Sequence, residues 1–276
     1  MQVESLSDVM GAAVSGVDLA DTADSAATEA LNAALARHVL LCVRGQDFGP
    51  AGLARAAARF GPLKTYVTVQ DRLPDVPEVS VVSNRPPGFG GKPMVQARYW
   101  HTDDSYLALP ATLTILQAKT LPDTGGDTEF INCYLALDRM PADLRRRIEG
   151  LRAVHVYRSR RAGSPVVART AEERAATPDV DHPLIRTHPV TGRQALYINP
   201  NRIDRILGWG EAESDALLDE LYAHAFRPEF QYRHRWRPGD VVIWDNRCAM
   251  HRANDDYDLA QLRVMHRVML EGERPV

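Results

Sequence analysis

Two histidines and an aspartate in this chain have the residue types of a metal site. His101 and Asp103 stand two positions apart in the run YWHTD at 99–103, and His251 follows an apolar run much further along. In a strand, residues i and i+2 project to the same face, so the imidazole and the carboxylate would lie together. Two histidines and one carboxylate on one face of a metal are typical of non-haem Fe(II) oxygenases. His-x-Asp alone fits a structural core histidine or a surface pair equally well.

Two arginines after His251 favour the metal-site interpretation. Arg263 and Arg267 lie in a run that indicates a strand, with Met265 on the same face. Guanidinium groups that face the inside of a barrel need anions, because an unpaired buried charge is costly. A dicarboxylate cosubstrate would supply them, since the planar fork of arginine binds a carboxylate bidentately. The alternative places both arginines on a solvated face and the residues between them in the core.

The elements that would position these residues are mostly short strands. Apolar periodicity predicts helices over 25–38 and 50–60, with a buried strand at 39–43 between them. From residue 76 onward, β-rich runs separated by turn residues indicate a sandwich, barrel or jelly roll. These runs are 78–83, 111–118, 128–131, 153–157, 184–187, 195–199, 230–236, 241–244 and 263–270. Two further helices, near 142–149 and 211–226, are expected to pack outside the strands.

Composition excludes several classes of protein. The chain has 276 residues, 45% of them apolar, and a net charge of −3. This predicts one globular domain over 1–276, with no basic surface for nucleic acid. No apolar run is long enough to span a bilayer, and the first residues do not form a signal peptide. Cys42, Cys133 and Cys248 are widely spaced and odd in number, which predicts reduced thiols in a cytoplasm.

Two stretches are predicted to be lid loops. Residues 84–98 contain PPGFGG, and residues 159–181 are polar and charged. Long loops in a compact domain are often lids or binding loops, although ordinary surface loops have the same composition.

Further motifs occur along the chain in a specific order. They are GVDL at 16–19, RFGPL at 59–63, WHTD at 100–103, GGDT at 125–128, HPVTGR at 188–193 and WDNR at 244–247. Together with His251, Arg263 and Arg267, they make most of the chain resemble the taurine dioxygenase and dichlorophenoxyacetate dioxygenase family of 2-oxoglutarate-dependent oxygenases. The resemblance implies a mainly β fold with flanking helices, a cupin-like double-stranded β-helix or jelly roll.

The resemblance also implies cofactors and roles. His101, Asp103 and His251 match the ligands of a catalytic Fe(II), which reacts with 2-oxoglutarate and O2 and leaves succinate and CO2. Asp103 argues against halogenation, because related halogenases lack this carboxylate. It favours hydroxylation of a C–H bond, or a desaturation, cyclisation or bond cleavage that begins with the same hydrogen abstraction.

Four more residues match cosubstrate positions of the family. Thr128 and Arg263 match the residues that hold the distal carboxylate of 2-oxoglutarate. Arg267 matches a second arginine near the keto-acid end and the substrate, and Trp244 matches an aromatic that lines the pocket. Alternatively, Thr128 is an ordinary strand threonine after a Gly-Gly turn, and Trp244 is an ordinary core aromatic.

The sequence departs from taurine dioxygenase where that enzyme grips its substrate. Tyr66 stands near the position of the sulfonate-binding histidine, and Val69 near that of the amine-binding tyrosine. Ala97 replaces an asparagine. We therefore expect that taurine is not the substrate.

The residues found instead indicate a small anionic substrate, such as a carboxylate. The residues expected to line the substrate pocket are Tyr66, Arg98, Tyr99, Tyr106, Arg202 and Arg267. For Arg98 and Arg202, a surface salt bridge is the alternative.

Two other functions and an assembly state stay open on the sequence. A metal-binding jelly roll without oxygenase activity has the same fold, and a zinc hydrolase uses three similar ligands. Relatives often form dimers or tetramers, which makes a homo-oligomer an expectation.

Overall fold

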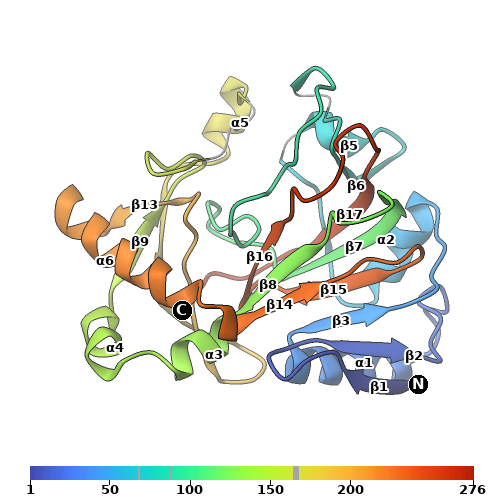
Figure 1. The fold of residues 1–276 in the computed structure, drawn as a ribbon, viewed down its shortest axis with the longest axis horizontal. Coiled ribbons are helices and arrows are strands. Elements are labelled where there is room, and N and C mark those ends of the chain that lie inside the picture. Colours follow the sequence, from blue (N-terminus) through green and yellow to red (C-terminus); the bar gives the residue numbers. More distant parts are fainter. Residues whose placement is uncertain (68, 87–88, 164–167) are drawn as a thin grey trace.

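The computed structural model describes residues 1–67, 69–86, 89–163 and 168–276, and places two β-sheets against each other (Figure 1). The larger sheet has nine strands in the order β1-β2-β3-β15-β7-β17-β6-β5, with β4 paired to β17. Its strands are β1 (Gln2–Ser5), β2 (Ala12–Ser15), β3 (Leu40–Val43), β4 (Leu63–Lys64), β5 (Arg72–Leu73), β6 (Val76–Ser83), β7 (Leu113–Thr120), β15 (Val241–Asp245) and β17 (Val264–Leu270). The facing sheet consists of β14 (Gln231–His234), β8 (Thr128–Asn132) and β16 (Ala249–Ala253).

The central strands of the larger sheet are buried on both faces. Along β3, Leu40 faces the core between the two sheets, whereas Leu41 faces a second core under the helices. Val242 and Ile243 of β15 divide in the same way. Successive side chains of a strand point to opposite faces, so such a strand requires a continuous apolar run. This explains the unbroken hydrophobic sequences at 39–43 and 241–244.

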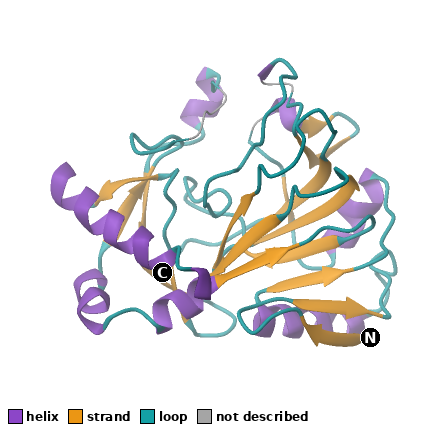
Figure 2. Ribbon diagram, viewed as in Figure 1, coloured by secondary structure: helices purple, strands orange, loops and turns teal. Residues whose placement is uncertain are grey.

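Two N-terminal helices cover the outer face of the larger sheet (Figure 2). Helix α1 (Ser25–His38) begins after Asp24, whose carboxylate accepts a hydrogen bond from the Ala27 amide at 2.9 Å. Helix α2 (Pro50–Ala58) begins with a proline, which has no amide hydrogen to leave unpaired in the first turn. Leu31 and Leu53 lie in the core that the two helices share with the sheet.

The remaining elements pack at the other end of the molecule. They are α3 (Cys133–Asp138), α4 (Ala142–Ile148), α5 (Ala171–Ala175), α6 (Glu211–Ala225), β9 (Arg152–His155), β10 (Val180–Pro183), β11 (Ile185–Thr187), β12 (Gln194–Leu196) and β13 (Ile203–Ile206). Helix α6 buries Leu217 and Leu221 in the core between the sheets, and α3 follows β8 directly with Asn132 as its N-cap. Short 3-10 turns occur at Val69–Asp71 and Pro228–Phe230.

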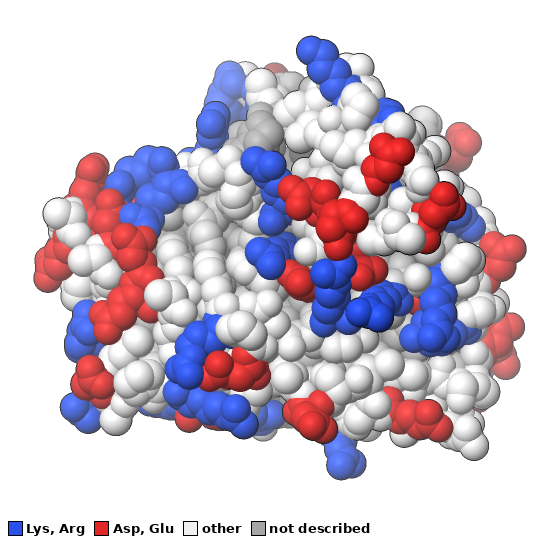
Figure 3. Space-filling model, viewed as in Figure 1, with Lys and Arg blue, Asp and Glu red and all other residues white. Residues whose placement is uncertain are grey.

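The predicted mainly β, jelly-roll architecture is confirmed, and the predicted helices and strands are found within a few residues of their expected ends. The β1–β2 hairpin, α3 and β16 were not predicted. In the described part of the chain, no helix is both long and apolar enough to cross a membrane. Acidic and basic side chains are interspersed on the face shown in Figure 3.

The two stretches predicted as lids are only partly described. Residues 87–88 and 164–167 lie outside the described residues. Helix α5, within the second stretch, lies on the same side of the molecule as β5 and the chain around residue 90 (Figure 1). The lid roles stay predictions.

Candidate active site

His101, Asp103 and His251 converge beside the facing sheet. Nε2 of His101 and Nε2 of His251 each lie 3.9 Å from a different carboxylate oxygen of Asp103. The two imidazole rings are 4.1 Å apart between centroids, and one ligand atom from each of the three residues lies within 4.8 Å of the others. Residues 150 positions apart in the chain therefore meet with donor atoms at the spacing of one metal ion.

The backbone brings His101 to His251 by a single bridge, not by a strand over 101–103. The His101 amide donates to the His251 carbonyl at 3.0 Å, and the His251 amide donates back at 2.8 Å. Asp103 lies in the turn that follows, where Asp104 has a φ of 54°. The strand geometry expected for His101 and Asp103 is wrong, although the side chains do meet. The turn, rather than a two-residue alternation, aims the carboxylate.

Hydrogen bonds to neighbouring groups orient two of these side chains. Nδ1 of His101 lies 2.8 Å from the Tyr99 carbonyl and therefore carries the proton, which leaves the Nε2 lone pair facing Asp103. Asp103 accepts a hydrogen bond from the Thr114 hydroxyl at 2.6 Å. Nδ2 of Asn246 donates to that hydroxyl oxygen at 2.8 Å. No sequence pattern pointed to Thr114, because it is an ordinary strand residue until its neighbours are known.

His251 is held by packing on aromatic rings. Its ring lies 4.6 Å from Trp244 and 6.0 Å from Phe130, between centroids. Trp244 is fully buried and donates from Nε1 to Asn246 at 3.0 Å. It does not line the cavity described below, so a role as a pocket wall is not what its position indicates. Instead, its ring packs against the imidazole of His251 and helps to fix its orientation.

Burial and charge give the three residues the protonation states that a divalent metal needs. Burial lowers the pKa of His101 and, together with the His101 ring, lowers the pKa of His251 to about 3. Burial would raise the pKa of Asp103, but His251, Arg267 and His101 outweigh it and hold that pKa at about 2. At neutral pH the site offers two neutral imidazoles and one carboxylate. This set fits Fe(II) with open coordination positions.

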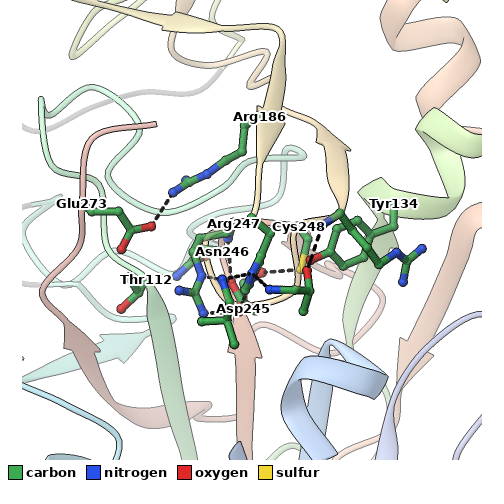
Figure 4. A network of polar contacts seen from close by, with 12 residues as sticks. Thr112, Tyr134, Arg186, Asp245, Asn246, Arg247, Cys248 and Glu273 are labelled. Atoms are coloured by element: carbon green, nitrogen blue, oxygen red, sulfur yellow. Dashed lines mark hydrogen bonds and ion pairs between the residues drawn. The ribbon is translucent and has the colours of Figure 1, made fainter. Parts of the chain in front are cut away.

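Two other groups in the described chain bring metal-ligating atoms together, but their atoms are already engaged. They are Cys42, His234 and Asp240, and His188, Asp245 and Cys248. The Asp240 carboxylate pairs with Arg44 at 2.9 Å and with His234 at 3.2 Å. In Figure 4, Asp245 lies among Asn246, Arg247 and Cys248, with Arg186 and Glu273 on one side and Tyr134 on the other.

A cavity of about 470 Å³ opens beside the triad. Five of the six residues predicted to bind the substrate line it: Tyr66, Arg98, Tyr99, Arg202 and Arg267. Tyr106 does not; it is buried behind Arg202, whose guanidinium carbon lies 4.7 Å from the Tyr106 ring centroid. The direct substrate contact predicted for Tyr106 stays a prediction, and the contact observed for its ring is with Arg202. The volume suits a small organic molecule.

Arg267 connects the cavity with the triad. Its Nη1 lies 3.8 Å from Oδ1 of Asp103, and Nε donates to the Ser80 hydroxyl at 3.1 Å. Its guanidinium carbon lies 4.4 Å from the Tyr66 ring centroid. Burial works against its charge, but Tyr66 and Asp103 raise the pKa of Arg267 above its usual value. The group is a permanent cation beside the metal ligands.

Arg263 is more deeply buried, at 5% exposure, which rules out the solvated-face alternative for this residue. Its Nε donates to the Gly126 carbonyl at 2.8 Å, and its backbone amide donates to Asn84 at 3.0 Å. Gly126 has a φ of 67°, and a Cβ there would lie 3.2 Å from the Arg263 side chain. This Gly-Gly turn therefore brings Arg263 alongside the start of β8, where Thr128 lies. No acidic group of the described chain forms an ion pair with Arg263.

Comparison with known families identifies the family that has this triad and these two arginines. Residues 2–269 match the profile of the taurine catabolism dioxygenase TauD, TfdA family. The chain belongs to this family. It is therefore an α-ketoglutarate-dependent (2-oxoglutarate-dependent) dioxygenase that works with Fe(II) and O2.

Individual relatives span nearly the whole chain. An alpha-ketoglutarate-dependent 2,4-dichlorophenoxyacetate dioxygenase of Cupriavidus pinatubonensis is 34% identical over 95% of this chain and 94% of its own length. A sulfate ester dioxygenase of Pseudomonas putida is 33% identical over 100% of this chain and 91% of its own. Among solved structures, a taurine dioxygenase from Burkholderia xenovorans has a TM-score of 0.84 at 34% identity, and covers 100% of this chain and 90% of its own.

A further solved structure bears on the metal centre. AAD-2, in complex with Mn(II) and N-oxalylglycine, has a TM-score of 0.82 at 30% identity, over 99% of this chain and 98% of its own. The similarity confirms the jelly-roll fold and the dependence of the family on a divalent metal.

The cavity of this oxygenase also contains residues that sequence reasoning missed. Asp71 lines it from the 3-10 turn, and Asp255 from the loop after β16. Val82, Met94 and Leu259 supply apolar wall. None of these positions belongs to a motif, so only the folded chain reveals them.

Proposed function

We propose that His101, Asp103 and His251 hold the Fe(II) of this oxygenase, and that Arg263 and Thr128 bind the distal carboxylate of 2-oxoglutarate. The observation that carries the proposal is the buried Arg263 guanidinium, which has no carboxylate of the described residues within ion-pair distance. A buried cation is stable only when an anion or strong acceptors compensate it. Thr128, which accepts a hydrogen bond from Trp236 at 3.0 Å, lies beside it and can turn its hydroxyl toward the same anion.

The reaction that we propose is hydroxylation of a C–H bond in a small organic anion. When bound, Fe(II), 2-oxoglutarate and O2 supply the oxidation, with succinate and CO2 as co-products. The chain's own residues prepare the site: the carboxylate of Asp103 stays ionised, the two imidazoles stay neutral, and Arg267 fixes a positive charge at 3.8 Å from Asp103. The walls of the cavity exclude water around the reacting bond.

Arg202 is the group that we propose to anchor the substrate anion. Its guanidinium carbon lies 5.1 Å from the Tyr157 ring centroid, and Nη1 donates to the Tyr157 carbonyl. Its contacts with the Tyr106 and Tyr157 rings hold it in one orientation, and the residue lines the cavity. Neither Arg202 nor Arg98 pairs with an acidic side chain in the described part of the chain, so the surface salt bridge expected as an alternative is not observed there. The names of several relatives, for 2,4-dichlorophenoxyacetate, sulfate esters and phenoxypropionate, also denote anions.

Taurine is not the substrate that we propose. Tyr66 occupies the cavity near the position where taurine dioxygenase has its sulfonate-binding histidine, and its ring lies against Arg267. Ala97, which replaces an asparagine of taurine dioxygenase, also lines the cavity and has no side-chain hydrogen-bonding group. Taurine should therefore stimulate no succinate release.

The remaining parts of the proposal concern assembly and surroundings. We propose that 1–276 acts as a single catalytic domain in the cytoplasm, supported by three buried cysteines with free thiols. A homo-oligomer is proposed from the resemblance to dimeric and tetrameric relatives. Sedimentation velocity at micromolar concentration tests it, and a single monomeric species would contradict it.

The test of the cofactor assignment is an anaerobic titration of metal-free protein with Fe(II), then 2-oxoglutarate. We expect the weak visible charge-transfer band of the chelate to appear in wild type and to be absent in His101→Ala. In Arg263→Ala it should require about 10-fold to 100-fold more 2-oxoglutarate, because one charge-assisted bidentate contact is lost. Wild type that binds iron but shows no band would contradict the proposed site.

A further inference from the structure

The cavity contains one partly buried carboxylate that the reaction proposed above does not use. Among its described lining residues, Asp103 faces the two histidines and Asp104 pairs with Lys64 at 3.0 Å. Asp255 is exposed at the rim, whereas Asp71 is partly buried. Asp71 forms no hydrogen bond or ion pair with any residue that the structure describes.

The backbone around Asp71 fixes where this carboxylate lies. Arg72, the next residue, donates from Nε to the Tyr66 carbonyl at 2.5 Å and pairs with Ser80 across β5 and β6. Ser80 in turn lies opposite Arg267 in the pairing of β6 and β17. Asp71 is thereby held on the Arg267 side of the cavity, although it is not within ion-pair distance of that guanidinium.

Burial without a partner is unfavourable for a carboxylate, and its effect on Asp71 is visible. Burial raises the pKa of Asp71, and Arg267 offsets this only in part. A cationic group in the cavity would remove the cost, because an opposite charge favours the ionised form. The carboxylate is thus better matched to a ligand cation than to the empty cavity.

The cavity also has features that match other parts of a ligand. Arg202, stacked on two tyrosine rings, offers a fixed cation that forms no ion pair with an acidic side chain among the described residues. Val82, Met94 and Leu259 provide apolar wall. Opposite charges at two places with hydrocarbon surface around them are complementary to a zwitterion with an apolar body.

We propose that the substrate of this oxygenase is a carboxylic amino acid with an apolar side chain, whose ammonium group binds Asp71 and whose carboxylate binds Arg202. This inference rests on the proposed function and narrows its substrate class from anions to zwitterions. Asp71 acts as a specificity-determining residue and takes no part in the bond-breaking step.

The experiment uses Fe(II)- and 2-oxoglutarate-loaded enzyme with matched sets of probes. One set is norleucine, hexanoate and pentylamine, and another is phenylalanine, 3-phenylpropanoate and 2-phenylethylamine. Within each set the carbon skeleton is the same, and only the amine or the acid group is missing. Succinate release at initial rate gives kcat/KM for each probe.

In wild type, we expect at least one amino acid to exceed its deaminated acid by about 10-fold or more in kcat/KM. Asp71→Asn should remove most of this preference by lowering kcat/KM for the amino acid and leaving the deaminated acid unchanged. The matched control is Asp75→Asn, which removes the same charge from an exposed position outside the cavity lining and should change both values less than about 2-fold. Asp71→Ser provides a second variant if the amide of Asn disturbs the loop.

Three results would overturn the inference while the chelate band still forms. They are deaminated acids that serve as well as amino acids, an Asp71→Asn variant in which both probes fall equally, and a panel in which no amino acid raises succinate release. An equal fall would mean that Asp71 only orients Arg267. Absence of the chelate band in wild type would instead refute the cofactor assignment, so the two failures are distinguishable.

Discussion

The triad of His101, Asp103 and His251 and the group of His188, Asp245 and Cys248 contain similar ligand atoms at similar spacing. Their hydrogen bonds differ. Asp245 accepts from Arg247 at 2.8 Å and 2.6 Å, from the Arg247 amide at 2.9 Å, and from Nε2 of His188 at 2.9 Å. Nδ1 of His188 in turn faces two backbone amides at 3.2 Å. Both carboxylate oxygens of Asp245 and both ring nitrogens of His188 are therefore engaged in hydrogen bonds.

Asp103 has a hydrogen bond from Thr114 on one oxygen, whereas Nη1 of Arg267 and Nε2 of His101 lie 3.8 Å and 3.9 Å from its other oxygen. The side chain of His101 is hydrogen-bonded only on the nitrogen that faces away from the aspartate. The two groups therefore share their residue types and the proximity of their ligand atoms. Only the triad of His101, Asp103 and His251 has lone pairs that are left unoccupied. We conclude that the saturation of hydrogen bonds separates a structural network from a reactive site in this fold.

The largest expected effect comes from removing the carboxylate of Asp103 from the triad. Asp103→Ala should lower the affinity for Fe(II) by about 100-fold or more, because even the loss of a residue behind a metal ligand costs 10-fold to 100-fold. Equilibrium dialysis under anaerobic conditions measures it. Asp245→Ala, assayed in the same way at low temperature, should change the affinity less than about 3-fold, and equal losses in the two variants would contradict the distinction.

The group of His188, Asp245 and Cys248 should instead contribute to the stability of the fold. Asp245→Ala leaves the buried His188 and the partly buried Arg247 without their acceptor, which we expect to lower the free energy of unfolding by about 3–5 kcal/mol. Urea unfolding of the metal-free protein at pH 7 provides the value. A loss below about 1 kcal/mol would show that the network of Figure 4 is not a stabilising one.

This stabilisation should depend on pH with a defined sign. Burial would raise the pKa of Asp245, but hydrogen bonds from Arg247 and His188 hold it well below its usual 3.8. Below pH 3.8 the unfolded chain therefore binds a proton that the folded chain does not. The difference in unfolding free energy between wild type and Asp245→Ala should be constant from pH 5 to 8, and shrink by about 1.4 kcal/mol per pH unit below pH 3.8.

A suitable control for the pH series is Asp138→Ala, which removes an exposed partner of Arg193. Its effect on unfolding should stay under about 1 kcal/mol at every pH, because exposed ion pairs contribute little. A difference for Asp245→Ala that grows toward acid would mean that the carboxylate is protonated in the folded chain.

The smallest expected effect is that of replacing Cys248, which tests whether this residue binds a metal. Cys248 is buried, and its Sγ lies 3.8 Å from the Asp245 carbonyl. Cys248→Ala should cost about 1 kcal/mol, from loss of a small apolar group, and leave the metal content at one ion per chain. Elemental analysis after reconstitution with Fe(II) or Zn²⁺ checks this, and a drop in bound metal would identify a second site.

Much of the protein follows from its sequence because the relevant signals are local. The apolar runs at 39–43 and 241–244 predict strands that are buried on both faces, and Pro50 marks the start of a helix. The ordered motifs predict the family, and with it the jelly roll and the dependence on Fe(II) and 2-oxoglutarate. The strands β2 and β16 were missed because they are short and pair with the distant strands β3 and β8. Strand β1 is an exposed edge strand, so it has no apolar pattern to reveal it.

The distinctions that matter for chemistry were decided by tertiary structure. His-x-Asp did not reveal that a turn, with Asp104 in the left-handed region, aims the carboxylate. No local pattern separated Asp103 from Asp245, or showed that Tyr106 lies behind Arg202 while Asp71 faces the cavity. The physical reason is that the burial of a side chain, the number of its hydrogen bonds and the charges around it depend on atoms from distant parts of the chain. The sequence determined which residues were available for chemistry, and the fold decided which of them have lone pairs and charges left to use.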